Sequence, residues 1–114
     1  MKHHHPRVMS MGQIAALLLA SLAAGTTHAG DAAAGKARAG MCATCHGPLG
    51  ISQLPNAPHL AGQPEIYMIE QLKQYRSGKR ANEVMAVIAK PMTDTEIEDL
   101  AAWYSSITIK VTEK

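Results

Sequence analysis

The chain has 114 residues, with 46% hydrophobic but only 4% aromatic side chains, and a formal net charge of +2. This length allows one small domain, and the near balance of eleven basic and nine acidic residues excludes the strongly basic surface of a nucleic-acid-binding protein. With one Trp, three Tyr and no Phe, the chain has little apolar surface of its own from which to build a core.

Residues 1–29 predict a secretory signal peptide. Lys2 and Arg7 give a positive start, residues 14–24 form an apolar run, and Thr27-His28-Ala29 supplies the small residues that a signal peptidase reads. The run is shorter than the roughly twenty apolar residues of a membrane span. We expect cleavage after Ala29, with an uncleaved anchor as the alternative. The predicted mature domain covers residues 30–114, is periplasmic and has no stable membrane span.

Residues 31–40 predict the first helix of the mature chain. Alanine dominates this stretch and favours helix, and Asp31 stands at a capping position. Gly35 and Ala39 lie four residues apart on one helix face, where a second helix can approach closely. The helix is expected to run directly into the motif that follows.

Residues 42–46 read Cys-Ala-Thr-Cys-His, the attachment signature of a c-type haem. Two thiols at this spacing can bond the two vinyl groups of one porphyrin, and His46 can then bind the iron. A redox dithiol and half of a zinc site are the alternatives for such a cysteine pair. No βαβ pattern accompanies the pair, and the other histidines lack zinc-finger spacing. We therefore predict one covalent haem c, with iron, held by Cys42, Cys45 and His46.

These two cysteines are the only ones in the chain, so no disulfide can stabilise so small a domain. The haem must take that role. We therefore expect the apoprotein to be largely unfolded.

Prolines and glycines punctuate residues 47–63, which predicts a long loop that wraps the edge of the haem. The second ring nitrogen of His46 should donate a hydrogen bond to a backbone carbonyl, which fixes the ring. A carbonyl within residues 55–58 of the loop is placed to accept it.

A second helix is predicted between Pro64, a favoured first helical residue, and Gly78, a favoured terminator. Its expected buried stripe consists of Ile66, Ile69, Leu72 and Tyr75. The cations near its far end are Lys73, Arg76, Lys79 and Arg80. They are either a patch that steers an acidic partner or simply a solvated helix end.

A short helix is predicted over residues 82–89, because Pro91 pushes the residue before it out of the helical region. The last helix has the clearest start, a capping box in which Thr93 is the cap and Glu96 reaches back. Its apolar face consists of Ile97, Leu100, Ala101, Tyr104 and Ile107. The predicted fold is all-α, with about four helices wrapped around one haem.

The far side of the iron needs a second axial ligand, for which the mature chain offers four methionines and His59. Met41 adjoins the attachment motif and cannot easily reach across, and Met68 sits inside a regular helix. Met85 and Met92 lie near the break before the last helix, where the chain can cross the open haem face. A methionine is more often core filler than a ligand, so the residues alone leave both candidates open.

The mature chain resembles class I cytochrome c, of the small bacterial periplasmic type found as one-haem proteins and as one half of tandem two-haem proteins. The resemblance covers nearly all of residues 30–107. The matching stretches are Gly35-Lys36-Ala37, Cys42-Ala43-Thr44-Cys45-His46-Gly47, Pro55-Asn56-Ala57-Pro58, Leu60-Ala61-Gly62-Gln63, Tyr67, Gln71-Leu72, Tyr75-Arg76, Gly78, Met92-Thr93-Asp94, Ile97, Leu100-Ala101-Ala102 and Tyr104.

The resemblance implies that Met85 is the second axial ligand, because this subgroup carries its sulfur ligand in a stretch like residues 83–86. Met92 is the runner-up, and a bis-histidine site through His59 is a more remote alternative. The resemblance also implies that the first and last helices cross. The residues expected at the crossing are Gly35, Ala39, Leu100 and Tyr104.

With both axial positions filled, the iron has no open position for a substrate, so we expect an electron carrier with no catalytic residues rather than an enzyme. Its expected partners are respiratory redox proteins that dock transiently: a membrane oxidase, a cytochrome complex or a periplasmic dehydrogenase. The protein is expected to be a monomer or a weak dimer. One alternative is a haem subunit of a larger dehydrogenase, such as a sulfur-compound oxidising enzyme. Another is a ligand-binding or peroxidatic haem protein, if the methionine ligand is labile.

Overall fold

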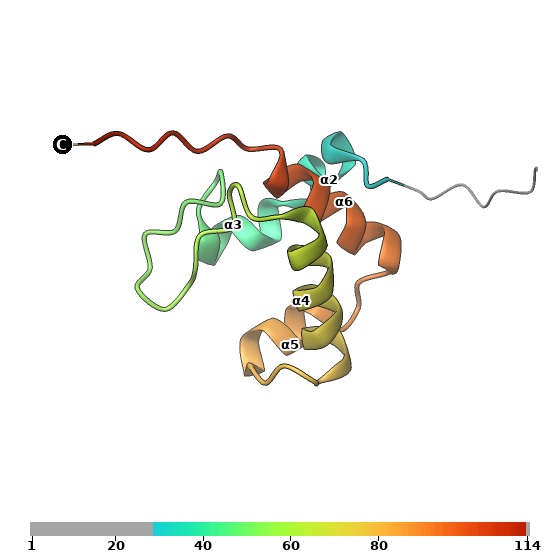
Figure 1. Ribbon diagram of the computed structural model, residues 1–114. Helices are drawn as coiled ribbons and strands as arrows, with labels where there is room; N and C mark the ends of the chain where they lie inside the picture. Colours follow the sequence, from blue (N-terminus) through green and yellow to red (C-terminus); the bar gives the residue numbers. More distant parts are fainter. Residues whose placement is uncertain (1–28, 114) are drawn as a thin grey trace, which may run out of the picture.

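The structure is a computed structural model and describes residues 29–113 (Figure 1). The predicted signal peptide lies outside the described residues except for Ala29. Within residues 29–113 the chain forms helices and no strand, which confirms the all-α prediction. The helices are α2 (Ala32–Arg38), α3 (Gly40–His46), α4 (Glu65–Ser77), α5 (Glu83–Ala89) and α6 (Asp94–Ser105). In this part of the chain no helix is both long and apolar enough to cross a membrane.

The first and last helices, α2 and α6, cross in close contact (Figure 1). A Cβ atom on Gly35 would lie 1.9 Å from the carbonyl oxygen of Asp99 and 2.9 Å from Cβ of Trp103. Only glycine permits this approach of the two backbones. Ala39, four residues further along, is 5% exposed and belongs to the same hydrophobic core as Tyr104. The predicted crossing is therefore confirmed, although Gly35 meets the backbone of Asp99 rather than an apolar side chain.

The structure divides the helix that was predicted over residues 31–40. Helix α2 ends at Arg38 and α3 begins at Gly40, with Ala39 forming a turn between them. The N–H of Ala39 donates to the carbonyl of Lys36 at 3.3 Å, a tighter connection than an α-helical one. Ala39 is buried in the core, so tertiary packing sets a turn that the helix propensity of the alanines does not reveal.

Helix α4 spans the segment predicted between Pro64 and Gly78 and packs against both α5 and α6. One part of its predicted stripe is wrong: Ile66 is 83% exposed, whereas Met68 and Leu72 are buried. Side chains two residues apart on a helix point in directions that differ by about 200°, so Ile66 projects from the face opposite Met68.

The capping box that was predicted to start α6 is present. Thr93 Oγ1 accepts from the backbone N–H of Glu96 at 3.2 Å, and the Glu96 carboxylate accepts from the N–H of Thr93 at 2.8 Å. The carboxylate also accepts from the Thr93 hydroxyl, and the two bonds that it accepts favour its charged form and lower the pKa of Glu96. The buried face of the helix includes Ile97, Leu100, Ala101 and Tyr104, as predicted.

Helix α5 packs against α4 and against no other helix of the described part. The Asn82 side chain caps it by accepting from the backbone N–H of Met85 at 2.9 Å. The short helix predicted over residues 82–89 is thus confirmed, with Asn82 as its cap.

Candidate functional site

A cavity of about 670 Å³ opens among α3, α4, α5, α6 and the loop over residues 47–63. Its volume lies in the range of cofactor pockets, about 300–1,000 Å³. The site residues predicted from the sequence that line it are Cys42, Cys45, His46, His59, Met41, Met68, Met85 and Met92. The fold therefore brings the attachment motif and every candidate for the second axial ligand to one cavity.

Helix α3 presents the motif to this cavity because positions i, i+3 and i+4 share one face of a helix. Cys42 is half-buried, Cys45 is exposed and His46 is 8% exposed. Burial raises the pKa of the Cys42 thiol and keeps it neutral near pH 7. No group of three His, Cys, Asp or Glu side chains in residues 29–113 is placed to hold a metal ion.

One ring nitrogen of His46 is hydrogen-bonded to the loop over residues 47–63. Its Nδ1 lies 2.7 Å from the carbonyl oxygen of Pro58. A carbonyl can only accept, so Nδ1 carries the proton and Nε2 keeps the lone pair that a metal ligand needs. This confirms the predicted hydrogen bond to residues 55–58 and shows how the ring orientation is fixed.

Ser52 holds this loop in place, although the sequence analysis did not single it out. The side chain is buried, and its Oγ donates to the carbonyl of Cys45 at 3.0 Å and accepts from the N–H of Leu54 at 3.0 Å. The backbone N–H of Ser52 donates to Nδ1 of His59 at 2.8 Å. A single serine in a loop carries no sequence signal of burial, so only the folded structure identifies this role.

His59 is engaged by that same hydrogen bond. It directly follows Pro58, whose carbonyl holds His46, so it belongs to the segment that supports the histidine of the motif. This arrangement lends no support to a bis-histidine site through His59.

We expect Ser52→Ala to lower the free energy of unfolding of the holoprotein by about 1–3 kcal/mol, because the carbonyl of Cys45 and the N–H of Leu54 lose a partly buried hydrogen-bond partner. Denaturant unfolding followed by haem absorbance measures the loss. Ser106→Ala is the matched control, because that hydroxyl donates to the Trp103 carbonyl at 2.7 Å on an exposed surface. The control should change stability by no more than about 0.5 kcal/mol. Equal losses in the two variants would contradict the role of Ser52.

The four methionines of the cavity differ in burial. Met68 and Met92 are 6% and 7% exposed and belong to the hydrophobic core, whereas Met41 is 56% exposed. Met85 is half-buried on α5, at the edge of the core. A side chain packed within the core is filler, so this distribution favours Met85 over Met92 as the candidate ligand.

One part of the cavity wall is polar and can accommodate the acidic groups of a porphyrin. The Arg80 guanidinium donates to Gln71 Oε1 at 2.5 Å and lies 4.7 Å from the centre of the Tyr75 ring. Within the described chain Arg80 has no carboxylate partner, and Asn82 lines the cavity beside it. The apolar wall, the paired thiols, the histidine and this cation together fit a covalently bound haem.

Tyr104 closes the cavity from α6. The side chain is 1% exposed, and burial raises the pKa of its hydroxyl well above the usual range. Within residues 29–113 that hydroxyl has no hydrogen-bond partner. It therefore stays protonated and serves as a neutral part of the wall next to Cys42.

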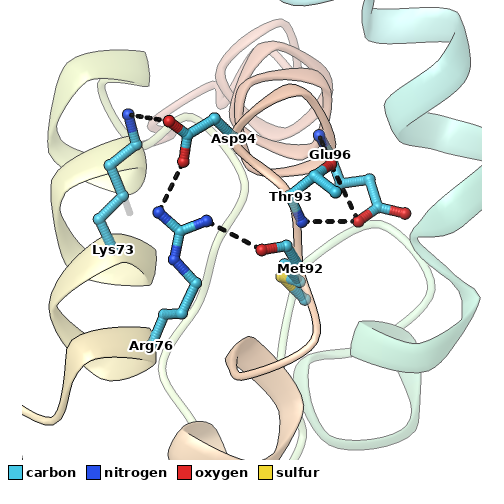
Figure 2. Close-up of polar contacts among 6 residues, drawn as sticks. All are labelled: Lys73, Arg76, Met92, Thr93, Asp94 and Glu96. Atoms are coloured by element: carbon cyan, nitrogen blue, oxygen red, sulfur yellow. Dashed lines mark hydrogen bonds and ion pairs between the residues drawn. The ribbon is translucent and has the colours of Figure 1, made fainter.

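A second polar cluster ties α4 to the start of α6, as Figure 2 shows. Arg76 donates to the carbonyl of Met92 at 2.8 Å and to Asp94 Oδ1 at 2.6 Å, and Lys73 Nζ lies 3.7 Å from Asp94 Oδ2. The guanidinium of Arg76 holds the pKa of the Asp94 carboxyl below its usual range.

These contacts bear on the four cations expected near the end of α4. Lys73 and Arg76 are paired with Asp94, and Arg80 is bound by Gln71. In the described chain these four cations thus meet one carboxylate, that of Asp94, and the choice between a solvated helix end and a patch that steers an acidic partner stays a prediction.

Comparison with known proteins places the chain among haem proteins. The Cytochrome c family model matches residues 32–108. A cytochrome c4 of Thiocapsa roseopersicina is 46% identical over 84 residues, covering 73% of this chain and 43% of that protein. A thiosulfate dehydrogenase electron acceptor of Thiomonas intermedia is 36% identical over 103 residues, covering 89% of this chain and 44% of that protein. The chain spans about half the length of these curated relatives.

The likeness extends to solved structures. The crystal structure of reduced cytochrome c4 from Pseudomonas stutzeri aligns with a TM-score of 0.67 at 38% sequence identity. The alignment covers 70% of this chain and 47% of that one. Sequence and backbone therefore agree on the same fold.

Proposed function

The chain belongs to the cytochrome c family, and from this membership we propose that it is a periplasmic protein that carries single electrons between respiratory redox partners. Haem c is the cofactor of the family and supplies an iron that alternates between two oxidation states. The proposal assigns the thioether bonds to Cys42 and Cys45 and the axial positions to His46 and Met85. The observation that carries it is the single cavity that all four side chains line.

Each of these residues has a distinct task in the proposed function. His46, oriented by the Pro58 carbonyl, would hold the iron through Nε2. Met85 would offer its thioether on the other side, and histidine–methionine ligation raises the reduction potential relative to a bis-histidine site. The predominantly apolar lining of the cavity would disfavour the additional positive charge of the oxidised iron.

Electrons need an exposed edge through which to enter and leave. At the mouth of the cavity Cys45 is exposed, and the apolar side chains of Met41 and Leu54 are 56% and 46% exposed. We assign transient docking of a redox partner to this rim, because weak electron-transfer encounters use small interfaces.

The second candidate function is that of a haem subunit in a larger periplasmic dehydrogenase. The relative named a thiosulfate dehydrogenase electron acceptor favours an enzyme of sulfur compounds as the partner class. Purification from the native host at low ionic strength separates the two candidates. A second chain in constant proportion identifies a subunit, and a lone haem protein identifies a free carrier.

The visible spectrum of the ferric holoprotein tests the proposed function. We expect the weak long-wavelength charge-transfer band of a methionine–iron bond in the wild type, its loss in Met85→Ala and its retention in Met92→Leu. A band that survives in Met85→Ala and disappears in Met92→Leu would move the ligand to Met92. A wild-type protein without the band would instead favour the ligand-binding or peroxidatic alternative.

A further inference from the structure

Helix α5 carries Met85 and forms one side of the cavity wall. Its only helix neighbour in the described chain is α4, and two of its apolar side chains, Val84 and Val87, are 64% and 73% exposed. Its position therefore depends on α4 and on the two segments that flank it. At its start the Asn82 cap provides one attachment.

The attachment at the other end of α5 is made by Arg76. The last residue of α5, Ala89, is 0% exposed, and its carbonyl accepts from the N–H of Met92 at 3.0 Å. The carbonyl of Met92 in turn accepts from Nη1 of Arg76 at 2.8 Å, and Nη2 of the same guanidinium binds Asp94 (Figure 2). One side chain of α4 thereby holds both the turn that ends α5 and the first residue of α6.

We propose that Arg76 is a positioning residue for the axial ligand: it fastens the connection between α5 and α6 to α4 and so keeps Met85 directed at the iron. This inference rests on the proposed role of Met85. It assigns to Arg76 control over how readily the methionine is displaced, not a contact with the haem.

The two bonds of Arg76 contribute unequally. The Asp94 side chain is 61% exposed, so the ion pair is screened by water and salt and contributes little. The bond to the Met92 carbonyl is partly buried and has a charged donor, which makes it the stronger of the two. A neutral replacement removes both bonds, whereas a lysine can keep only one.

The ferric holoprotein can be titrated with imidazole, which competes with methionine for the iron, at fixed pH and ionic strength. Arg76→Met lacks the charge-assisted hydrogen bond to the Met92 carbonyl, so moving α5 and Met85 away from the iron costs less free energy in this variant. We therefore expect Arg76→Met to bind imidazole about tenfold more tightly than the wild type. Arg76→Lys should tighten the affinity by a smaller factor. If Arg76→Met fails to incorporate haem, the titration of Arg76→Lys tests the proposal in its place.

Arg38→Met is the matched control. Arg38 also pairs with a carboxylate in the first turn of α6, that of Glu96 at 2.5 Å, but it holds no part of the connection that follows α5. Its imidazole affinity should stay within about twofold of the wild type. An unchanged affinity in both Arg76 variants, or equal tightening in Arg38→Met, would overturn the positioning role while leaving Met85 as ligand. A wild type without the methionine–iron band would overturn both the ligand and this inference.

Discussion

Gly35→Ala is expected to lower the free energy of unfolding of the holoprotein by about 3 kcal/mol, at the upper end of the usual cost of overpacking. The added Cβ would lie 1.9 Å from the Asp99 carbonyl oxygen and 2.9 Å from Cβ of Trp103. Because the nearest obstacle is backbone, no side chain can rotate away, and α2 and α6 must separate. Alanine gains only about 1 kcal/mol of helix propensity over glycine, so the clash decides the sign.

Gly40→Ala is the control for this prediction. Gly40 also lies in a helix, at the start of α3, but a Cβ there would meet nothing within 4 Å. The substitution should leave stability unchanged or raise it by up to about 1 kcal/mol. Denaturant unfolding of both holoproteins, monitored by circular dichroism, measures the difference. If the two variants lose the same stability, the close crossing is not what requires glycine at position 35.

The double variant Cys42→Ala/Cys45→Ala is expected to lose the covalent haem and most of its fold. The cavity of about 670 Å³ would then have no apolar body to enclose, in a chain with few large core side chains. A domain of this size without disulfides or a cofactor is at the limit of stability. We expect far-ultraviolet circular dichroism to show a large loss of helix and thermal unfolding to lose its cooperativity.

A single-cysteine variant controls for the loss of the thiols themselves. Cys45→Ala removes the exposed thiol and leaves Cys42 to form one thioether bond, so this variant should keep its haem and most of its helix. A double variant that stays helical and unfolds cooperatively would show that the polypeptide alone encodes a stable fold.

Local signals allowed much of this fold to be predicted from the sequence. The capping box at Thr93 and the glycine after α4 act through neighbouring residues, so both helix boundaries could be predicted. The turn at Ala39 could not, because it results from burial in the core, and neither could the outward position of Ile66. Periodicity identifies residues that share a face but does not say which part of the helix meets a neighbour.

In the candidate site, too, some residues could be predicted from the sequence and others could be identified only in the structure. The motif predicted that Cys42, Cys45 and His46 hold one haem, and the structure adds that α3 brings all three to one cavity. Four methionines reach the same cavity, so composition could not choose among them, and their unequal burial adds the information that favours Met85. The roles of Ser52 and Arg76 depend on residues seven and sixteen positions from their partners, which no local pattern indicates.

The contacts of α3 have a consequence for the order of events in the biogenesis of the protein. Among the described helices the backbone of α3 lies next to α2 alone. Its other fixed contacts are to the loop, through the hydrogen bond from Ser52 to the Cys45 carbonyl and the hydrogen bond from His46 to the Pro58 carbonyl. The position of this helix at the edge of the cavity therefore depends on α2 and on the loop. We therefore expect the attachment sequence to be accessible before the fold is complete, so that covalent attachment of the porphyrin precedes the final packing of α4 and α6 around it.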